Sequence, residues 1–511
     1  MNIIEDQSRV ITFLSEAKNY PEPTTQVQQI ETHGAIVFLT DTKAYKLKKS
    51  VYFPYMDYST LSQRKLMCDR EIFLNQRTAA EIYLQVLPVT QEDDNTLAFQ
   101  GQGEAIEWLV EMNRFDPENV LDLVAARGEL TPEIIDTLAI KIVDFHQKAE
   151  PSDRHFGAES LIKIIMGNDE QFATHKTILP RDRTQQLTDR SLTLIEQYRQ
   201  LLDRRQKEGY IKHCHGDLHL HNICLYRDEP IFFDAIEFNE LFSIIDVLYD
   251  LAFLLMDLDF RNFSTYANTI FNYYSWQEND YKGVALLPLF LATRAAVRAH
   301  VSVAIAEGLH DRAKRPIFLQ EAAAYLEKSL AYLTPRTPKC VAIGGLSGTG
   351  KSTLAKAIAP QLDLCPGALI LRSDVIRKLH FNIPLGDRLP ESYYSKEVSK
   401  IVYHKLFAIA RTALQAGITV IVDCVFADPN LRQEVEIVAK TGNIPFYGIW
   451  LDVPSEIAYQ RIAERTQDVS DATVAIRQKQ ESLDFGEMQW QVFDASLEQV
   501  ILLEQVKSYI S

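Results

Sequence analysis

The stretch GGLSGTGKST at 344–353 has the residue types and the spacing that hold nucleotide phosphates. It meets the pattern G-x-x-x-x-G-K-[ST], in which backbone amides wrap the phosphates, the lysine neutralises them and the hydroxyl, here that of Ser352, ligates Mg²⁺. An apolar run precedes it and a helical pattern follows, so a helix N-terminus would face the phosphates. We predict that ATP contacts eight residues of this loop: Gly345, Ser347, Gly348, Thr349, Gly350, Lys351, Ser352 and Thr353.

A second stretch, HCHGDLHLHN at 213–222, has residues suited to phosphoryl transfer. His215, Asp217 and Asn222 meet the H-x-D-L-x-x-x-N spacing of a kinase catalytic loop. Asp234 ends a short apolar run downstream, where a carboxylate for Mg²⁺ is expected. We predict that Asp217 orients the acceptor hydroxyl and takes its proton, while Asn222 and Asp234 hold Mg²⁺ through oxygen atoms.

The histidine-rich stretch leaves two other interpretations open. Its histidines and the neighbouring cysteines could bind zinc, although spacings of one or two residues match no common structural-zinc pattern. The histidines could also be packed for stability alone. The residues in question are His213, Cys214, His215, His219, His221 and Cys224.

Upstream elements must position these groups. Two apolar runs within 35–48 predict a β-hairpin, in which Lys46 and Lys48 share a face. A long helical pattern follows and places Glu71 on a partly apolar stripe. A carboxylate there is costly unless a cation pairs with it, so we expect a lysine of the hairpin as its partner. Lys46, Lys48 and Lys49 are all candidates, and two unrelated surface charges are the alternative.

The N-terminal part resembles the aminoglycoside phosphotransferase and choline kinase group, whose H-G-D-x-H-x-x-N loop is met at 215–222. The resemblance implies an α+β protein-kinase-like fold. It also implies that Lys46 binds the α and β phosphates of ATP, that Glu71 pairs with this lysine, and that Glu111 and Met112 lie at the adenine hinge. The Asp-Phe-Gly and Ala-Pro-Glu motifs of protein kinases are missing, which argues against a protein-kinase role.

Polar residues end the strands predicted after the phosphate loop. Apolar runs alternate with helical patterns, which predicts an α/β fold with a parallel sheet and a site at the strand C-termini. There we expect Asp374 to receive the acceptor hydroxyl proton, Arg377 to hold an anionic group of the acceptor and Asp423 to ligate Mg²⁺ through water. Each aspartate could instead cap a helix. The predicted strands are 368–372, 417–422 and 446–452.

Arg461 and Arg465 are four residues apart on a predicted helix and therefore share a face. They could close over the transferring phosphoryl group, or they could form a solvated basic face. With the phosphate loop and the S-D-x-x-R sequence at 373–377, they make residues 340–511 similar to small P-loop kinases that include gluconate kinase, zeta-type toxins and 5′-end polynucleotide kinases. This resemblance implies a phosphotransfer reaction and no particular substrate.

Two prolines within LTPRTPK mark a linker at 335–339, so we predict a kinase-like domain at 1–334 and a P-loop domain at 340–511. The composition, 46% hydrophobic and 24% charged, is that of a folded globular protein. A net charge of −16 argues against a general affinity for nucleic acid or anionic membrane. Six scattered cysteines and an acidic N-terminus fit a cytoplasmic protein.

We therefore expect a bifunctional enzyme that uses ATP and Mg²⁺ to phosphorylate hydroxyl groups of small molecules, one in each domain. Two alternatives remain open. The P-loop domain could act on nucleic-acid 5′ ends, although the acidity of the chain argues against this. Alternatively, one domain could sense nucleotide and regulate the other. The sequence indicates neither acceptor and no oligomeric state.

Overall fold

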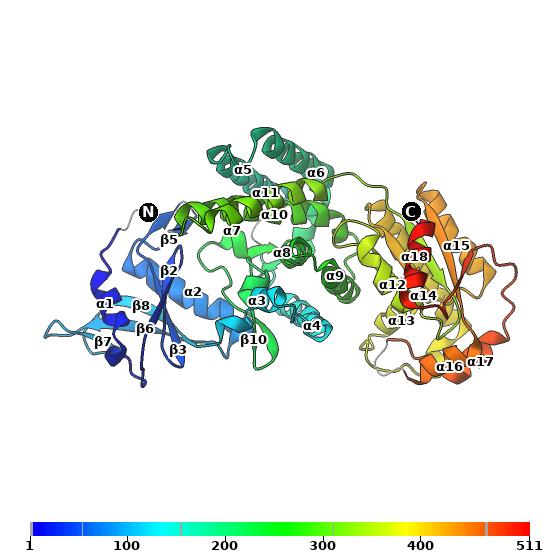
Figure 1. Cartoon of the computed structure of the whole chain (residues 1–511), viewed down its shortest axis with the longest axis horizontal. Coiled ribbons are helices and arrows are strands. Elements are labelled where there is room, and N and C mark those ends of the chain that lie inside the picture. The colour runs from blue at the N-terminus through cyan, green and yellow to red at the C-terminus, as the bar shows by residue number, and fades with distance from the viewer. Residues whose placement is uncertain (1–3, 54, 154–155, 310, 465–468, 511) are drawn as a thin grey trace. The chain divides into compact units, whose positions relative to one another are not determined.

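The computed structural model describes residues 4–53, 55–153, 156–309, 311–464 and 469–510 (Figure 1). The chain forms two compact units, each assembled from two segments. One comprises Met1–Leu161 and Arg199–Leu254, and the other comprises Ile162–Tyr198 and Leu255–Ser511.

An antiparallel sheet of six strands, in the order β1-β2-β3-β8-β6-β7, organises the start of the first unit. The predicted hairpin is β2 with β3, and Val37 pairs with Lys46 while Ala35 pairs with Lys48, so both lysines share a face. The strands are β1 (Gln28–Glu31), β2 (Ala35–Leu39), β3 (Lys43–Lys48), β6 (Tyr83–Gln91), β7 (Leu97–Phe99) and β8 (Glu104–Asn113).

Helix α2 (Leu61–Ala79) packs on β6 and β8 (Figure 1). It begins where the Thr60 side chain accepts a hydrogen bond from the Gln63 amide, which satisfies one of the unpaired donors of the first turn. Glu71 lies on the buried face of this helix, as the apolar stripe predicts. A small hairpin, β4 (Tyr52–Phe53) with β5 (Met56–Asp57), precedes it.

Short strands and helices complete the first unit around the predicted catalytic loop. Two two-stranded ladders, β9 with β12 and β10 with β11, frame this loop. The elements are α1 (Ser8–Ser15), α3 (Leu121–Ala126), α4 (Pro132–Lys148), β9 (Ile211–His213), β10 (Ile223–Tyr226), β11 (Glu229–Phe232), α7 (Glu240–Ser243), β12 (Ile244–Asp246) and most of α8 (Val247–Phe260).

The second unit contains a parallel sheet of five strands in the order β14-β15-β13-β16-β17. Four of its strands follow the apolar runs of the sequence, and β17 is an addition. The strands are β13 (Cys340–Gly344), β14 (Leu369–Arg372), β15 (Val420–Asp423), β16 (Phe446–Asp452) and β17 (Gln491–Asp494). The helices that follow the phosphate loop are α12 (Lys351–Ile358), α13 (Ser373–His380), α14 (Lys396–Gln415), α15 (Pro429–Thr441), α16 (Ser455–Ala463), α17 (Val474–Glu481) and α18 (Gln499–Ile510). Of these, α12, α13, α14, α15 and α18 contact strands of this sheet.

Helices from the sequence before residue 335 belong to this second unit: α9 (Ser264–Glu278), α10 (Leu287–Gly308), α11 (Arg315–Tyr332) and much of α5 (Ala158–Thr174) and α6 (Arg181–Lys207). The stretch Gly283–Gly308 is long and apolar enough to cross a membrane, yet 72% of its most apolar window is buried inside the protein, as in a core helix. The domain limits at 334 and 340 stay a prediction, and they differ from the limits of the compact units.

Candidate active sites

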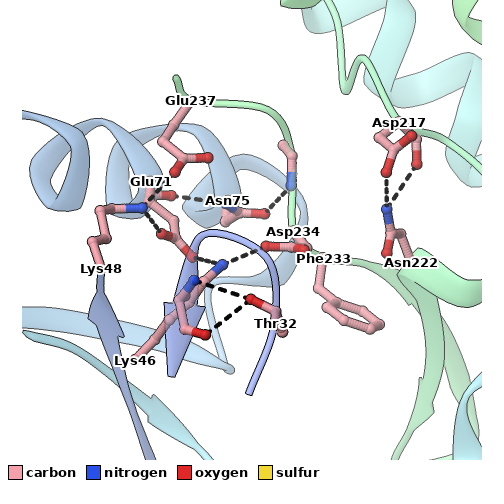
Figure 2. A network of polar contacts seen from close by, with 12 residues as sticks. Thr32, Lys46, Lys48, Glu71, Asn75, Asp217, Asn222, Phe233, Asp234 and Glu237 are labelled. Atoms are coloured by element: carbon pink, nitrogen blue, oxygen red, sulfur yellow. Dashed lines mark hydrogen bonds and ion pairs between the residues drawn. The ribbon is translucent and has the colours of Figure 1, made fainter. Parts of the chain in front are cut away.

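The loop between β9 and β10 presents the predicted catalytic aspartate. The Asn222 side-chain amide donates to Asp217 Oδ2 at 2.8 Å and to the Asp217 carbonyl at 3.0 Å (Figure 2). His219 Nε2 lies 3.3 Å from the same carboxylate oxygen. The Asp217 side chain is 37% exposed, so an acceptor hydroxyl can reach it while its neighbours fix its orientation.

A buried carboxylate, that of Asp250, also holds the backbone of this loop. Asp250 accepts hydrogen bonds from the backbone amides of His215, at 3.0 Å, and Gly216, at 2.9 Å. Burial lowers the pKa of His215, against the raising effect of nearby carboxylates. The neutral ring then donates from Nε2 to the Phe233 carbonyl at 2.9 Å, which ties the catalytic loop to the strand that leads to Asp234.

The zinc interpretation of this stretch gains no support from the described residues. Among the described residues, ligand atoms within 4.8 Å of one another come from His146, Cys214 and Asp250, and of these Cys214 alone belongs to the histidine-rich stretch. Asp250 already accepts hydrogen bonds from the two loop amides, and His146 Nε2 lies 3.2 Å from Asp250 Oδ2, the same oxygen that accepts from the His215 amide. The hydrogen bonds of this buried cluster therefore hold the catalytic loop in place.

Asp234 has a left-handed backbone, with φ of +62°, a conformation that non-glycine residues adopt at a cost. Two side chains hold it there, because the Asp234 amide donates to Tyr83 Oη at 3.1 Å and the Ala235 amide donates to Asn75 Oδ1 at 2.9 Å. The Asp234 carboxylate is 46% exposed and is available to a cation. Sequence reasoning missed Tyr83 and Asn75, since nothing in their spacing marks them.

The lysines of β3 converge on Glu71 (Figure 2). Lys46 Nζ lies 2.7 Å from Glu71 Oε1 and 2.6 Å from Asp234 Oδ1. Lys48 Nζ lies 2.6 Å from Glu71 Oε2 and also pairs with Glu237. Lys49 instead contacts Glu31 and the Thr32 carbonyl. Of the three candidates, Lys46 is the one that joins Glu71 to the predicted metal carboxylate.

Attraction between opposite charges keeps Lys46, Lys48 and Glu71 ionised although they are largely buried. Desolvation would lower the pKa of Lys46 and of Lys48, but the adjacent carboxylates outweigh it and hold both values well above the usual range. Burial would likewise raise the pKa of Glu71, but the two lysines lower it to about 2. The side chains of Lys48 and Glu71 are 1% and 0% exposed, so the site contains a buried, charged scaffold.

The predicted adenine-hinge residues lie at the end of β8. Glu111 accepts a hydrogen bond from Gln85 at 2.8 Å and lies 3.5 Å from Lys43, and Met112 is buried. Strand β8 ends one residue later, at Asn113. Their contact with adenine stays a prediction.

In the second unit the phosphate loop joins β13 to α12. Gly348 and Gly350 have φ of +85° and +90°, which only glycine adopts readily, and a Cβ on Gly348 would lie 2.7 Å from the Ala458 carbonyl oxygen. Ser352 Oγ donates to Asp423 Oδ2 at 2.5 Å. The structure therefore brings together the two oxygen donors predicted to serve Mg²⁺.

A cavity of about 1070 Å³ extends from this loop to the C-terminal end of β14. Burial and the charge of Asp423 raise the pKa of Asp374, against the lowering effect of Ser470, Arg372 and Arg377. A raised pKa suits a group that accepts a proton, because a carboxylate with the usual pKa is a weak base. Lining residues include Lys351, Ser352, Asp374, Arg377, Asp423 and Arg461.

Arg377 presents a buried cation to this cavity. It is 5% exposed, and its Nη1 donates to the Tyr393 carbonyl at 2.9 Å while its guanidinium lies 4.7 Å from the centre of the Tyr394 ring. Its Nε is buried and has no hydrogen-bond partner among the residues that the structure describes. Because an unpaired buried donor is costly, this atom indicates a place for an acceptor atom of a ligand.

The predicted arginine pair is described in part. Arg461 lines the cavity and donates to the Ala495 carbonyl at 2.9 Å, whereas Arg465 lies outside the described residues. Arg372 Nε lies 3.4 Å from Asp423 Oδ2, and its place at the end of a predicted strand could have identified it.

Two residues of α17 hold the phosphate loop and were also missed. Arg477 Nη1 donates to the Ser347 carbonyl at 3.0 Å, and the Ser347 amide donates to Gln480 Oε1 at 2.8 Å. They lie in a short polar helix without a recognisable motif, so sequence reasoning had no signal for them.

Both halves of the chain match known protein families. Residues 90–287 match the phosphotransferase enzyme family, and residues 341–484 match an AAA domain. Uncharacterized proteins of Mycobacterium bovis and Mycobacterium tuberculosis are 28% identical over 463 residues, which cover 89% of this chain and 89% of theirs.

Similar solved structures include a choline kinase from Cryptosporidium parvum, with a TM-score of 0.43 and 13% identity over 64% of this chain and 95% of that one. A gluconokinase from Sinorhizobium meliloti has a TM-score of 0.24 and 20% identity over 34% of this chain and 93% of its own. The APS kinase CysC of Mycobacterium tuberculosis, solved with AMPPNP and APS, has a TM-score of 0.26 and 20% identity over 34% and 97%.

Proposed function

We propose that this chain, which joins a kinase-like region of the phosphotransferase enzyme family to a P-loop kinase domain, is bifunctional and transfers the γ-phosphate of ATP to a different hydroxyl acceptor at each site. The predicted two-domain fold class and the assignment to the kinases are confirmed. Each compact unit contains one aspartate predicted to accept a proton, Asp217 or Asp374, and one lysine predicted to bind phosphates, Lys46 or Lys351. This duplication is the observation that supports two reactions in one chain.

In the first unit, Lys46 would bind phosphates beside Asp234, and Asp217 would orient the acceptor. The amide oxygen of Asn222 and the carboxylate of Asp234 are hard oxygen donors of the kind that Mg²⁺ prefers. The Asp234 side chain is partly exposed, and hydrogen bonds hold its backbone in the left-handed conformation. Both features suit a carboxylate that binds a cation. Mg²⁺ bound there would neutralise charge on the phosphates of ATP.

In the second unit, Lys351 would neutralise the phosphates, and Ser352 with Asp423 would hold Mg²⁺. Asp374 would take the proton of the acceptor hydroxyl. The unpartnered Nε of Arg377 supports an acceptor that also has a carboxylate or phosphate group, because charge-assisted bonds to arginine are strong in a buried site. We therefore propose a hydroxylated anion as the acceptor of this half.

Transfer to nucleic-acid 5′ ends is the second candidate for the P-loop half, and the phosphate-bearing end of such a substrate would also suit Arg377. The net charge of −16 weighs against it. Activity on oligonucleotides that falls steeply with salt would favour it. We place the protein in the cytoplasm and expect no membrane partner, since the one described helix that is long and apolar enough to cross a membrane is largely buried.

The test is a phosphotransfer screen of the full chain with labelled ATP against panels of hydroxylated metabolites and oligonucleotides. Asp217→Asn and Asp374→Asn should each remove a different set of labelled products, because each aspartate serves one site. Loss of the same products in both variants, or of none in either, would contradict two independent reactions.

A further inference from the structure

Strand β14 is the edge of the parallel sheet, because β15 is its neighbour on one side and the sheet order ends there. An edge strand leaves alternate backbone groups without a ladder partner, and proteins commonly cover such an edge with a helix. The outward groups of β14 include the amide and carbonyl of Ile370, and the carbonyl of Ala368 precedes them.

Side chains of α9 satisfy these groups. The Asn272 side chain accepts from the Ile370 amide at 2.7 Å and donates to the Ala368 carbonyl at 3.3 Å. Trp276 Nε1 donates to the Ile370 carbonyl at 2.7 Å. Asn268 donates to the Ala368 carbonyl at 3.0 Å. Three side chains therefore provide the hydrogen bonds that a neighbouring strand would otherwise make with the edge of β14.

The contact is buried and closely fitted. Asn268, Asn272 and Trp276 are 3%, 2% and 7% exposed, and Trp276 packs in the same apolar cluster as residues of β13 and α12. Gly367 lies directly against α9, since a Cβ at this position would be 2.9 Å from Asn268 Nδ2. These bonds fix the position of the strand, because a shift of β14 would leave its buried amide and carbonyl groups without hydrogen-bond partners.

The residues that follow β14 are those assigned to the acceptor. The strand ends at Arg372, next to Asp423, and Asp374 opens the following helix. Helix α9 also reaches the cavity itself, where Thr265 is a lining residue. Yet α9 lies in the region that matches the phosphotransferase enzyme family, not in the P-loop match.

We propose that Asn272 and Trp276 are positioning residues for phosphotransfer at the P-loop site, acting through β14 on Arg372 and Asp374. The P-loop half is then completed by a helix that the upstream half supplies, and this ties the two catalytic regions into one obligatory chain. The inference rests on the function proposed for Asp374 and the phosphate loop.

The experiment uses the full chain with Asp217→Asn to silence the first site, and Mg²⁺ with ATP as the probe and water as the acceptor. The P-loop signal is the ATP hydrolysis that Lys351→Ala removes. Asn272→Ala and Trp276→Phe are introduced into this background. Trp276→Phe keeps a buried aromatic ring but loses the indole N–H and part of the ring volume, and the melting temperature reports the cost of that lost packing. Thr269→Ala, whose hydroxyl bonds within α9 to the Thr265 carbonyl, is the matched control.

We expect kcat to fall about 10- to 100-fold in both variants, since a displacement of about 1 Å at reacting groups has effects of that size. The KM for ATP should change less than about twofold, because the phosphate loop does not touch α9 through these bonds. Hydrogen exchange at the Ile370 amide should become faster in Asn272→Ala. Thr269→Ala should match the parent in all three readouts.

An unchanged kcat in both variants would overturn the inference, whatever happens to hydrogen exchange. A parallel loss of kcat, ATP affinity and melting temperature in Trp276→Phe would also overturn it, because α9 would then serve only the stability of the fold. ATP hydrolysis that persists in Lys351→Ala would instead refute the proposed P-loop function, and this result is distinguishable because it does not depend on α9.

Discussion

Replacing Lys48 with methionine tests whether the buried charges around Glu71 are matched. Lys48 is 1% exposed and bonds Glu71 and Glu237, which are 0% and 5% exposed. Methionine has a similar length and leaves little empty space, so the main effect is that two buried carboxylates lose a cation. Removal of one partner from a buried ion pair costs roughly 3–5 kcal/mol, a large part of the total stability of a typical domain, about 5–15 kcal/mol.

The assay is hydrogen exchange of peptides from β3 and α2 at increasing urea concentration, with the parallel sheet of the other unit as an internal reference. The matched control is Lys49→Met: its partner Glu31 is 70% exposed and is hydrated once the lysine is removed, so this variant should lose less stability than Lys48→Met. A change below about 1 kcal/mol for Lys48→Met, or equal changes in the two variants, would refute the charge-matching argument.

Three further predictions follow from the sites. The folded pKa of Glu71, about 2, lies below its ordinary 4.5, so its stabilisation is complete above about pH 4.5 and is lost towards pH 2; urea titrations across this range should lose roughly 3 kcal/mol that Glu71→Gln does not lose. Lys351→Ala should abolish transfer by the P-loop half and leave ATP binding by the first unit intact; unchanged P-loop turnover would exclude its assigned role. Asp374→Asn should lower kcat far more than ATP affinity, and the low-pH limb of the parent kcat/KM profile should lie above 3.8, because the pKa of Asp374 is raised from that value; an equal loss of ATP affinity would make it a metal ligand or a helix cap.

Local patterns predicted much of this structure. The phosphate loop, the catalytic loop and four strands of the parallel sheet lie where short motifs and apolar runs indicate, because both signals depend on neighbouring residues. Strand β17 was missed since it is short and mostly exposed, so no apolar run marks it. The sequence also could not distinguish Lys46 from Lys48, because both lie on one face of β3. Only the tertiary contacts show that Lys46 pairs with Asp234 and that Lys48 pairs with Glu237.

The role of α9 lay beyond sequence reasoning for a related reason. Asn268, Asn272 and Trp276 follow helical spacing and read as one face of a helix, with nothing to show that the opposing surface is a strand edge about 100 residues away in sequence. A proline-rich linker at 335–339 suggests independent halves, yet the side chains that cover β14 come from before it. Linker composition reports chain flexibility, and it carries no information about such contacts.

Calorimetric titration of the full chain with ATP in the presence of Mg²⁺ tests the central claim most directly. We predict two sites for each chain, one lost in Lys351→Ala and the other weakened in Asp234→Ala, with each variant keeping the site that its partner variant alters. Asp217→Asn should keep both sites, because its role concerns the acceptor. One ATP for each unmodified chain, or loss of the same site in both variants, would contradict the presence of two phosphotransfer sites.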